Sequence, residues 1–167
     1  MADKYIAQVN GQLAEIEATV VSSGVSSAGE IVGLDSTGRL SDTVMPVGIV
    51  PEVKNIISSE NLSAGNLVNI FNNSGTANVR RADNSNGRKV HGFVLASTTS
   101  PAAALVYLEG TITGLSALTP GAQEYLGTAG AATETPPTGT GVLSQQIGTA
   151  ISATEIAFAP QMTITLA

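Results

Sequence analysis

The chain has no cysteine and no tryptophan, and it has a single histidine. The absence of cysteine excludes a disulfide framework, thiolate metal ligands and a cysteine nucleophile. Charged residues make up only 12% of the sequence, about half the usual share, and aromatic residues only 4%. Serine and threonine, with 16 and 18 residues, take the place of charge. The sequence therefore predicts a surface solvated mainly by hydroxyl and amide groups.

Long apolar runs are missing as well. No stretch approaches 18 consecutive apolar residues, which predicts no membrane span. The first twelve residues lack the basic and continuously apolar segments of a secretion signal, so synthesis in a cytoplasm is expected. The formal net charge is −6, which disfavours binding to nucleic acid or to an anionic membrane. A length of 167 residues suits one domain with an additional arm or linker.

Residues 1–21 are expected to contain an amphipathic N-terminal helix. Apolar residues recur at spacings of 3, 4, 3 and 4, the rhythm of a coiled-coil seam, although Gly11 weakens the helix. One interpretation is a helix that packs on its own domain or on a neighbour, and the other is a short self-associating bundle. The seam consists of Ile6, Val9, Leu13, Ile16 and Val20.

Residues 22–53 are expected to form an extended arm or linker. Small residues from Ser22 to Gly29 break the helical pattern, and Pro46 and Pro51 interrupt the apolar residues near the end of this segment. Asp35 to Gly38 predicts a turn, in which the aspartate accepts backbone hydrogen bonds and the glycine supplies positive φ. The arm adds further apolar residues to the seam as candidate interface residues. They are Ile31, Leu34, Leu40, Met45 and Ile49.

Residues 54–167 are expected to form a β-rich domain. Short apolar segments, expected to be strands, alternate with turn signals, of which Asn72 to Gly75 is the strongest hairpin signal. The expected strands are residues 54–57, 66–71, 77–82, 90–95, 103–108, 111–115, 146–150, 155–158 and 163–166. Residues 127–141, with Pro136 and Pro137, are expected to be a long exposed loop. The predicted fold class is mainly β: a small barrel or sandwich of short antiparallel strands, with an N-terminal helix and an extended arm.

No residue pattern predicts a catalytic, cofactor-binding or metal site, and the chain is expected not to be an enzyme. His91, the only candidate histidine base, lies in an apolar run where a structural role is expected. Four of the seven basic residues gather around one turn. Three interpretations are open for this cluster: a solvated hairpin tip, an ionic contact with an acidic protein or, with less support, a nucleic-acid contact. The four are Arg80, Arg81, Arg88 and Lys89.

Several segments over residues 30–167 resemble the capsid decoration, or cement, proteins of tailed phages. In the second half they are Leu118 to Ala122 (LTPGA), Glu124 to Leu126 (EYL) and Ile147 to Phe158 (IGTAISATEIAF). Earlier in the chain they are Ile31 to Leu40 (IVGLDSTGRL), Met45 to Ile49 (MPVGI), Leu67 to Phe71 (LVNIF) with the NNSG turn after it, and the stretch from Arg80 (RRAD) to Leu95 (GFVL).

The resemblance implies a homotrimer on the outer surface of a virion, seated at threefold or quasi-threefold positions. Its partner there is the major capsid protein, whose neighbouring subunits it cements together, with no nucleic acid, membrane or cofactor involved. Within the same class, the alternative is a head or tail fibre subunit that binds a host receptor. Fibres usually contain repeats or a long coiled coil, and this sequence has neither.

Overall fold

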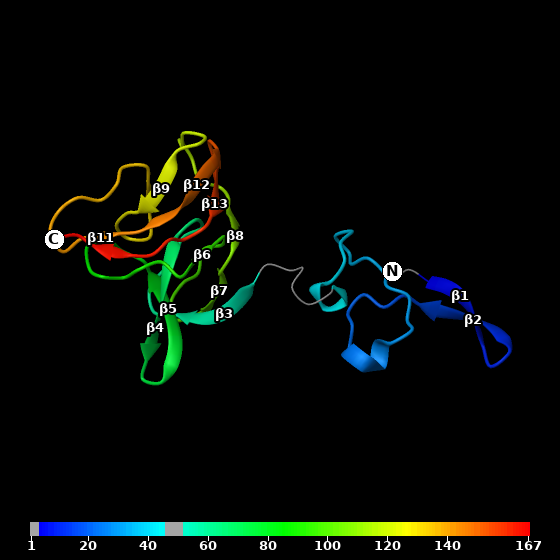
Figure 1. The fold of residues 1–167 in the computed structure, drawn as a ribbon. Helices are drawn as coiled ribbons and strands as arrows, with labels where there is room; N and C mark the ends of the chain where they lie inside the picture. The colour runs from blue at the N-terminus through cyan, green and yellow to red at the C-terminus, as the bar shows by residue number, and fades with distance from the viewer. Residues whose placement is uncertain (1–3, 46–51) are drawn as a thin grey trace. The chain divides into compact units, whose positions relative to one another are not determined.

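The computed structural model describes residues 4–45 and 52–167 and is mainly β. The chain divides into two compact units, Met1–Val50 and Pro51–Ala167. The predicted β-rich domain was expected to start at residue 54, and the first strand of the larger unit starts at Val53. Figure 1 shows the elements of each unit.

The N-terminal unit contains a β-hairpin where a helix was expected, so the helix prediction is wrong. Strands β1 (Lys4–Val9) and β2 (Gln12–Glu17) pair antiparallel, with Val9 opposite Gln12. The two loop residues, Asn10 and Gly11, have φ of 53° and 81°. Asn-Gly is the preferred pair for such a two-residue turn because both positions need positive φ. The turn signal therefore outweighs the helical spacing of the apolar residues.

Pairing as a hairpin divides the predicted apolar seam between two faces. Residues directly opposite in an antiparallel pair share a face, and neighbours along a strand alternate. Ile6 and Leu13 consequently lie on one face, whereas Val9 and Ile16 lie on the other. Val20 comes after the hairpin and is half-buried. The seam expected for a helix does not exist as one continuous surface.

The described part of the predicted arm, residues 22–45, is not extended throughout. It contains two 3-10 helices, Gly24–Ser27 and Asp42–Val44, and a bridge that pairs Thr19 with Val32. The turn expected at residues 35–38 is confirmed. One carboxylate oxygen of Asp35 accepts hydrogen bonds from the backbone N–H groups two and four residues later, at 2.8 and 3.0 Å, and Gly38 has φ of 77°.

The larger unit begins with a closed five-stranded barrel (Figure 1). Its order is β3-β5-β4-β6-β7. The expected hairpin around Asn72 to Gly75 is confirmed, since β4 and β5 pair antiparallel on either side of it. One barrel pair, β3 with β5, is parallel, which departs from the expected all-antiparallel arrangement. The barrel strands are β3 (Val53–Ser58), β4 (Leu67–Asn73), β5 (Thr76–Arg81), β6 (Gly92–Val94) and β7 (Ala103–Tyr107).

The second half of the larger unit forms an antiparallel sheet of order β10-β9-β12-β13-β8 and a small pair, β11 with β14. Strand β10 lies within the segment expected to be a loop, and β9 and β11 were not predicted. The sheet strands are β8 (Gly110–Ile112), β9 (Gln123–Leu126), β10 (Ala132–Thr133), β12 (Gln146–Ser152) and β13 (Glu155–Phe158); the small pair is β11 (Leu143–Ser144) with β14 (Ile164–Thr165).

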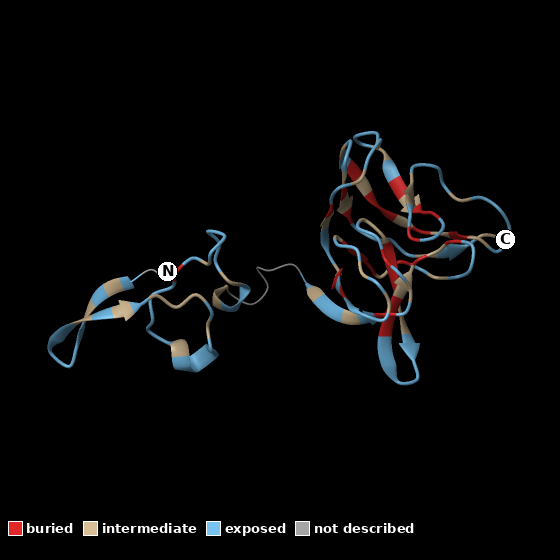
Figure 2. Ribbon diagram, turned by 180° about the vertical axis from the view of Figure 1, so that it is seen from behind, coloured by how far each residue is buried: buried red, intermediate tan, exposed pale blue. Residues whose placement is uncertain are grey.

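Two apolar clusters hold the larger unit together. Val68 and Val94 belong to a cluster built from barrel strands, whereas their neighbours Leu67 and Phe93 belong to a second cluster. That second cluster also contains side chains from β8, β9, β12 and β13. The rings of Phe158 and Phe93 pack edge to face there, with 5.1 Å between their centroids. Successive side chains of β4 and β6 point to opposite faces, so these two strands pack into both clusters and connect the barrel with the second sheet. Buried residues, red in Figure 2, are concentrated in this unit.

Candidate interaction surface

The N-terminal unit exposes its large apolar side chains instead of burying them. Leu13 is 80% exposed and Ile6 74%, and among the described residues of this unit only Gly33 is buried. Ile31, Leu34, Leu40 and Val9 are also exposed. Three predicted interface residues are half-buried, namely Ile16, Val20 and Met45, and Ile49 lies outside the described residues. Exposed residues beyond the predicted set are Val21, Val25 and Val32.

Polar contacts hold this unit together in place of an apolar core. The backbone N–H of Ser22 donates to Oγ1 of Thr43 at 2.9 Å, and the Thr19 hydroxyl donates to the Glu30 carboxylate. On the hairpin, Lys4 pairs with Glu15 at 2.6 Å, but both side chains are more than half exposed. Exposed pairs of this kind contribute about 0 to 1 kcal/mol. An isolated two-stranded hairpin is marginal in water, and this unit adds only such polar contacts and a few half-buried side chains to its own hairpin.

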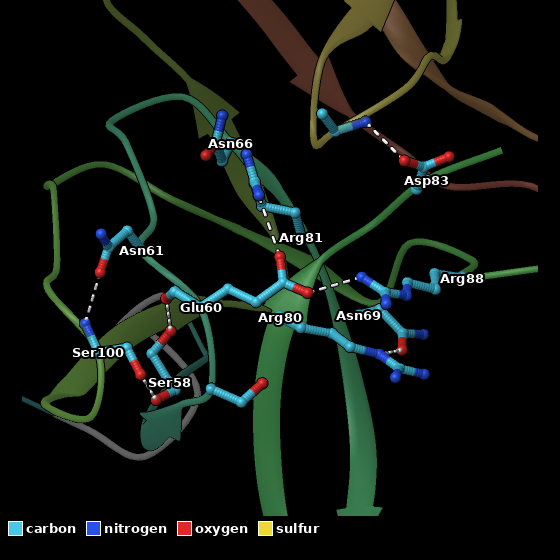
Figure 3. Close-up of polar contacts among 12 residues, drawn as sticks. Ser58, Glu60, Asn61, Asn66, Asn69, Arg80, Arg81, Asp83, Arg88 and Ser100 are labelled. Carbon is cyan, nitrogen blue, oxygen red and sulfur yellow. Dashed lines mark hydrogen bonds and ion pairs between the residues drawn. The ribbon is translucent and has the colours of Figure 1, made fainter. Parts of the chain in front are cut away.

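The predicted basic cluster lies in the larger unit and is occupied by internal contacts. Glu60 accepts from Nε of Arg81 at 3.0 Å and from an Nη of Arg88 at 2.6 Å (Figure 3). The Arg80 guanidinium lies 4.2 Å from the centre of the Phe71 ring. The solvated-tip interpretation is therefore wrong for these three arginines, which link β4, β5 and the segments after β3 and β5. Sequence spacing had not identified Glu60.

Glu60 is expected to stabilise the barrel through these two arginines. Partial burial opposes ionisation, but the hydrogen bonds and charges of Arg81 and Arg88 outweigh it and lower the pKa of Glu60. Glu60→Gln should reduce the free energy of unfolding at pH 7 by about 1–3 kcal/mol, measured by urea denaturation. The stabilisation exists above the ordinary value of 4.5 and disappears as the pH falls through the lowered pKa, so the difference should shrink in acid. Glu109→Gln, at an exposed site, is the control, and an equal loss there would contradict the assignment.

His91 has a structural contact, as expected from its apolar surroundings. Its Nδ1 accepts the backbone N–H of Ile70 at 2.9 Å, and its backbone N–H donates to the carbonyl of Val68 at 2.9 Å. His91 thereby extends the pairing with β4 by one residue before the start of β6. Burial, followed by the positive charge of Lys89, lowers the pKa of His91 and favours the neutral ring that the Nδ1 contact requires.

Metal and membrane features were searched over residues 4–45 and 52–167. No group of three or more histidine, cysteine, aspartate or glutamate side chains is placed there to hold a metal ion. No helix in the same ranges is long and apolar enough to cross a membrane. The surface with the clearest functional character is thus the exposed apolar set of the N-terminal unit. In comparisons with family models, curated proteins and solved structures, none matched this chain.

Proposed function

We propose that this chain is a structural protein of a tailed-phage virion that binds the outer surface of the capsid as a homotrimer and cements neighbouring major capsid subunits. The observation that carries the proposal is the contrast between the two units. The larger unit has its own apolar core, whereas the described part of the N-terminal unit buries no apolar side chain. A cement protein needs a part that folds on its own core and a part whose apolar side chains are free to bind the capsid, and the two units match these two needs.

The physical chemistry of attachment supports this division. A segment without a core orders on its partner and covers a large area for its length. Burial of an exposed side chain such as Leu13, Ile31 or Leu34 would contribute roughly 1.5–3 kcal/mol before ordering costs. A trimer would present three such units at once, and the second and third contacts form at high effective concentration. The resemblance in segments across residues 30–167 favours the same role.

The charge of the chain supports an outward location. The net charge is −6, and all five basic residues of the larger unit lie between Lys54 and Lys89. Three of those five already have the internal contacts described above, since Arg81 and Arg88 pair with Glu60 and Arg80 covers Phe71. Such a surface is repelled by packaged DNA. It is compatible with a position on the outside of the shell.

Cosedimentation with purified capsid shells tests the proposal. Protein added to shells lacking it should pellet with them, and its occupancy should fall less than about twofold between 0.1 M and 1 M sodium chloride. The Debye length falls from about 10 to 3 Å over this range, which removes charge contacts and leaves apolar ones. Asp35, one of the few charges of the arm, is already bound by its own turn. Sedimented alone, the protein should behave as a trimer.

Two results would count against the proposal. Wholesale release at 1 M salt would show that charge, and not the exposed apolar set, holds the contact. Binding to host cells with no binding to shells would favour the fibre-subunit alternative.

A further inference from the structure

Glu124, in the centre of the second sheet's strand β9, is a buried carboxyl group without a partner. Side chains alternate along this strand, so Glu124 and Leu126 are buried. Glu124 is 1% exposed, and neither of its carboxylate oxygens has a hydrogen-bond partner. An ionised carboxylate at a buried position is strongly disfavoured, because it loses its hydration and gains no hydrogen bond or ion pair to replace it.

A second carboxyl group lies across the sheet from it. Strand β10 pairs with β9 so that Ala132 is opposite Leu126 and Thr133 is opposite Tyr125. The next residue is Glu134, which is exposed and follows the end of β10; the same register, continued by one residue, places it opposite Glu124, on the same face. Oε1 of Glu134 accepts the backbone N–H of Thr119 at 2.5 Å. Burial, followed by the negative charge of Glu134, raises the pKa of Glu124.

No cation of the same chain can pair with these two groups from their own region. Between Gly110 and Thr154 the only charged residues are Glu124 and Glu134, and no lysine, arginine or histidine comes after His91 in the sequence. Strands β11 and β12 and the turn before β9 carry no charged or titratable side chain. Gly148, which lies opposite Glu124 on β12, has no side chain to offer. The Glu124 oxygens have no hydrogen-bond partner among the described residues, and a proton from solution can neutralise the carboxylate instead.

We propose that Glu124 and Glu134 form a proton-holding carboxyl pair that fastens β10 and the segment after it onto the sheet in acid and loosens them as the pH rises. A proton on Glu124 removes the negative charge of this side chain next to Glu134. The protonated carboxyl also has an O–H group that can donate a hydrogen bond. A hard divalent cation fits less well, because it needs about six to eight oxygen ligands and the pair supplies two carboxylates. The function is that of a pH-sensitive fastening in the body of the protein, and it does not depend on the proposed capsid role.

The sign of the effect is set by proton binding. The folded protein holds a proton on Glu124 more tightly than the unfolded chain does. The contribution of Glu124 to stability is therefore greatest in acid and is lost as the pH rises above the ordinary glutamate value of 4.5 and through the raised pKa. Glu124→Gln preserves the shape of the protonated side chain and cannot ionise. The substituted protein should lose this part of the pH dependence.

Thermal unfolding of the full chain at pH values from about 4.5 to 8 tests the proposal. The Tm of Glu124→Gln should match that of the unaltered protein in acid and exceed it by several degrees at the alkaline end. Glu134→Gln, which removes the facing charge, should give a smaller rise, and Glu155→Gln on β13 should give none. Amide hydrogen exchange of residues 132–141, compared between the unaltered protein and Glu124→Gln at the same alkaline pH, should be faster in the unaltered protein.

Two results would contradict the proposed proton-holding pair. Parallel Tm curves for the unaltered protein and Glu124→Gln would show that Glu124 does not change its ionisation in this range. A rise in Tm on adding calcium chloride near pH 8, seen in the unaltered protein and lost in Glu124→Gln, would make the pair a cation site. Either result leaves shell binding untouched, so it is distinguishable from failure of the proposed function.

Discussion

Removal of residues 1–51 is expected to reduce binding to capsid shells by at least about 100-fold while the remaining domain keeps its melting temperature. Both apolar clusters lie entirely within the larger unit, so its core survives the deletion. The exposed side chains of the smaller unit, by contrast, are the proposed contact. Losing several at roughly 1.5–3 kcal/mol each exceeds the 2.7 kcal/mol or so that a 100-fold change requires. Cosedimentation and calorimetry on the same preparation check both halves of the prediction.

Point variants test whether the apolar side chains themselves make the contact, since a deletion also removes the rest of the segment. Ile31→Asp and Leu34→Asp change exposed residues, so they should cost little in stability and still weaken binding by about tenfold each. Ser36→Asp, exposed in the same segment, is the matched control for added charge. If the shortened protein decorates shells as well as the full chain does, the attachment surface belongs to the larger unit.

Gly148→Ala is expected to destabilise the larger unit by about 3 kcal/mol or more, which lowers its Tm by roughly 10 °C. A Cβ at this position would lie 2.0 Å from the carbonyl oxygen of Ala157 and 3.0 Å from Cγ2 of Ile156. Both atoms belong to the neighbouring strand β13, and the pairing with β9 is irregular between Gln146 and Gly148. The backbone can yield only by breaking this ladder. Thermal and urea unfolding measure the loss.

Gly121→Ala is the matched control for that substitution. Gly121 has φ of 88° but open space around its Cβ position, so it should cost only the backbone strain of about 1–2 kcal/mol. A loss at Gly148 no larger than the loss at Gly121 would show that the sheet adapts to the added methyl group.

Strand periodicity and turn chemistry predicted much of the larger unit. The positions and lengths of the expected strands matched β3, β4, β5, β7 and β13 closely, and turn signals such as Asn72 to Gly75 marked where strands end. Short strands with weaker patterns were missed. Strand β9 carries a buried glutamate where an apolar residue would have marked it, and β10 is two residues long within a segment rich in small residues.

The N-terminal helix was predicted wrongly because two signals compete in the same residues. Ile6, Val9, Leu13 and Ile16 have helical spacing, but Asn10 and Gly11 form the turn that a two-residue hairpin prefers. The turn prevails because Asn and Gly adopt the positive φ that a two-residue hairpin needs at little cost, whereas Gly11 weakens a helix. Helical spacing over so few turns gains little without a partner.

By itself the sequence determined the β-rich class, the turns at Asp35 and Asn72 and the lack of any basic residue after His91. These depend on composition and on neighbours in the chain. Only the tertiary structure decided that Glu60 binds two arginines, that the barrel closes through a parallel pair, and that the buried Glu124 lies near Glu134. Those contacts join residues far apart in the sequence, and strand register, which local pattern does not specify, selects them.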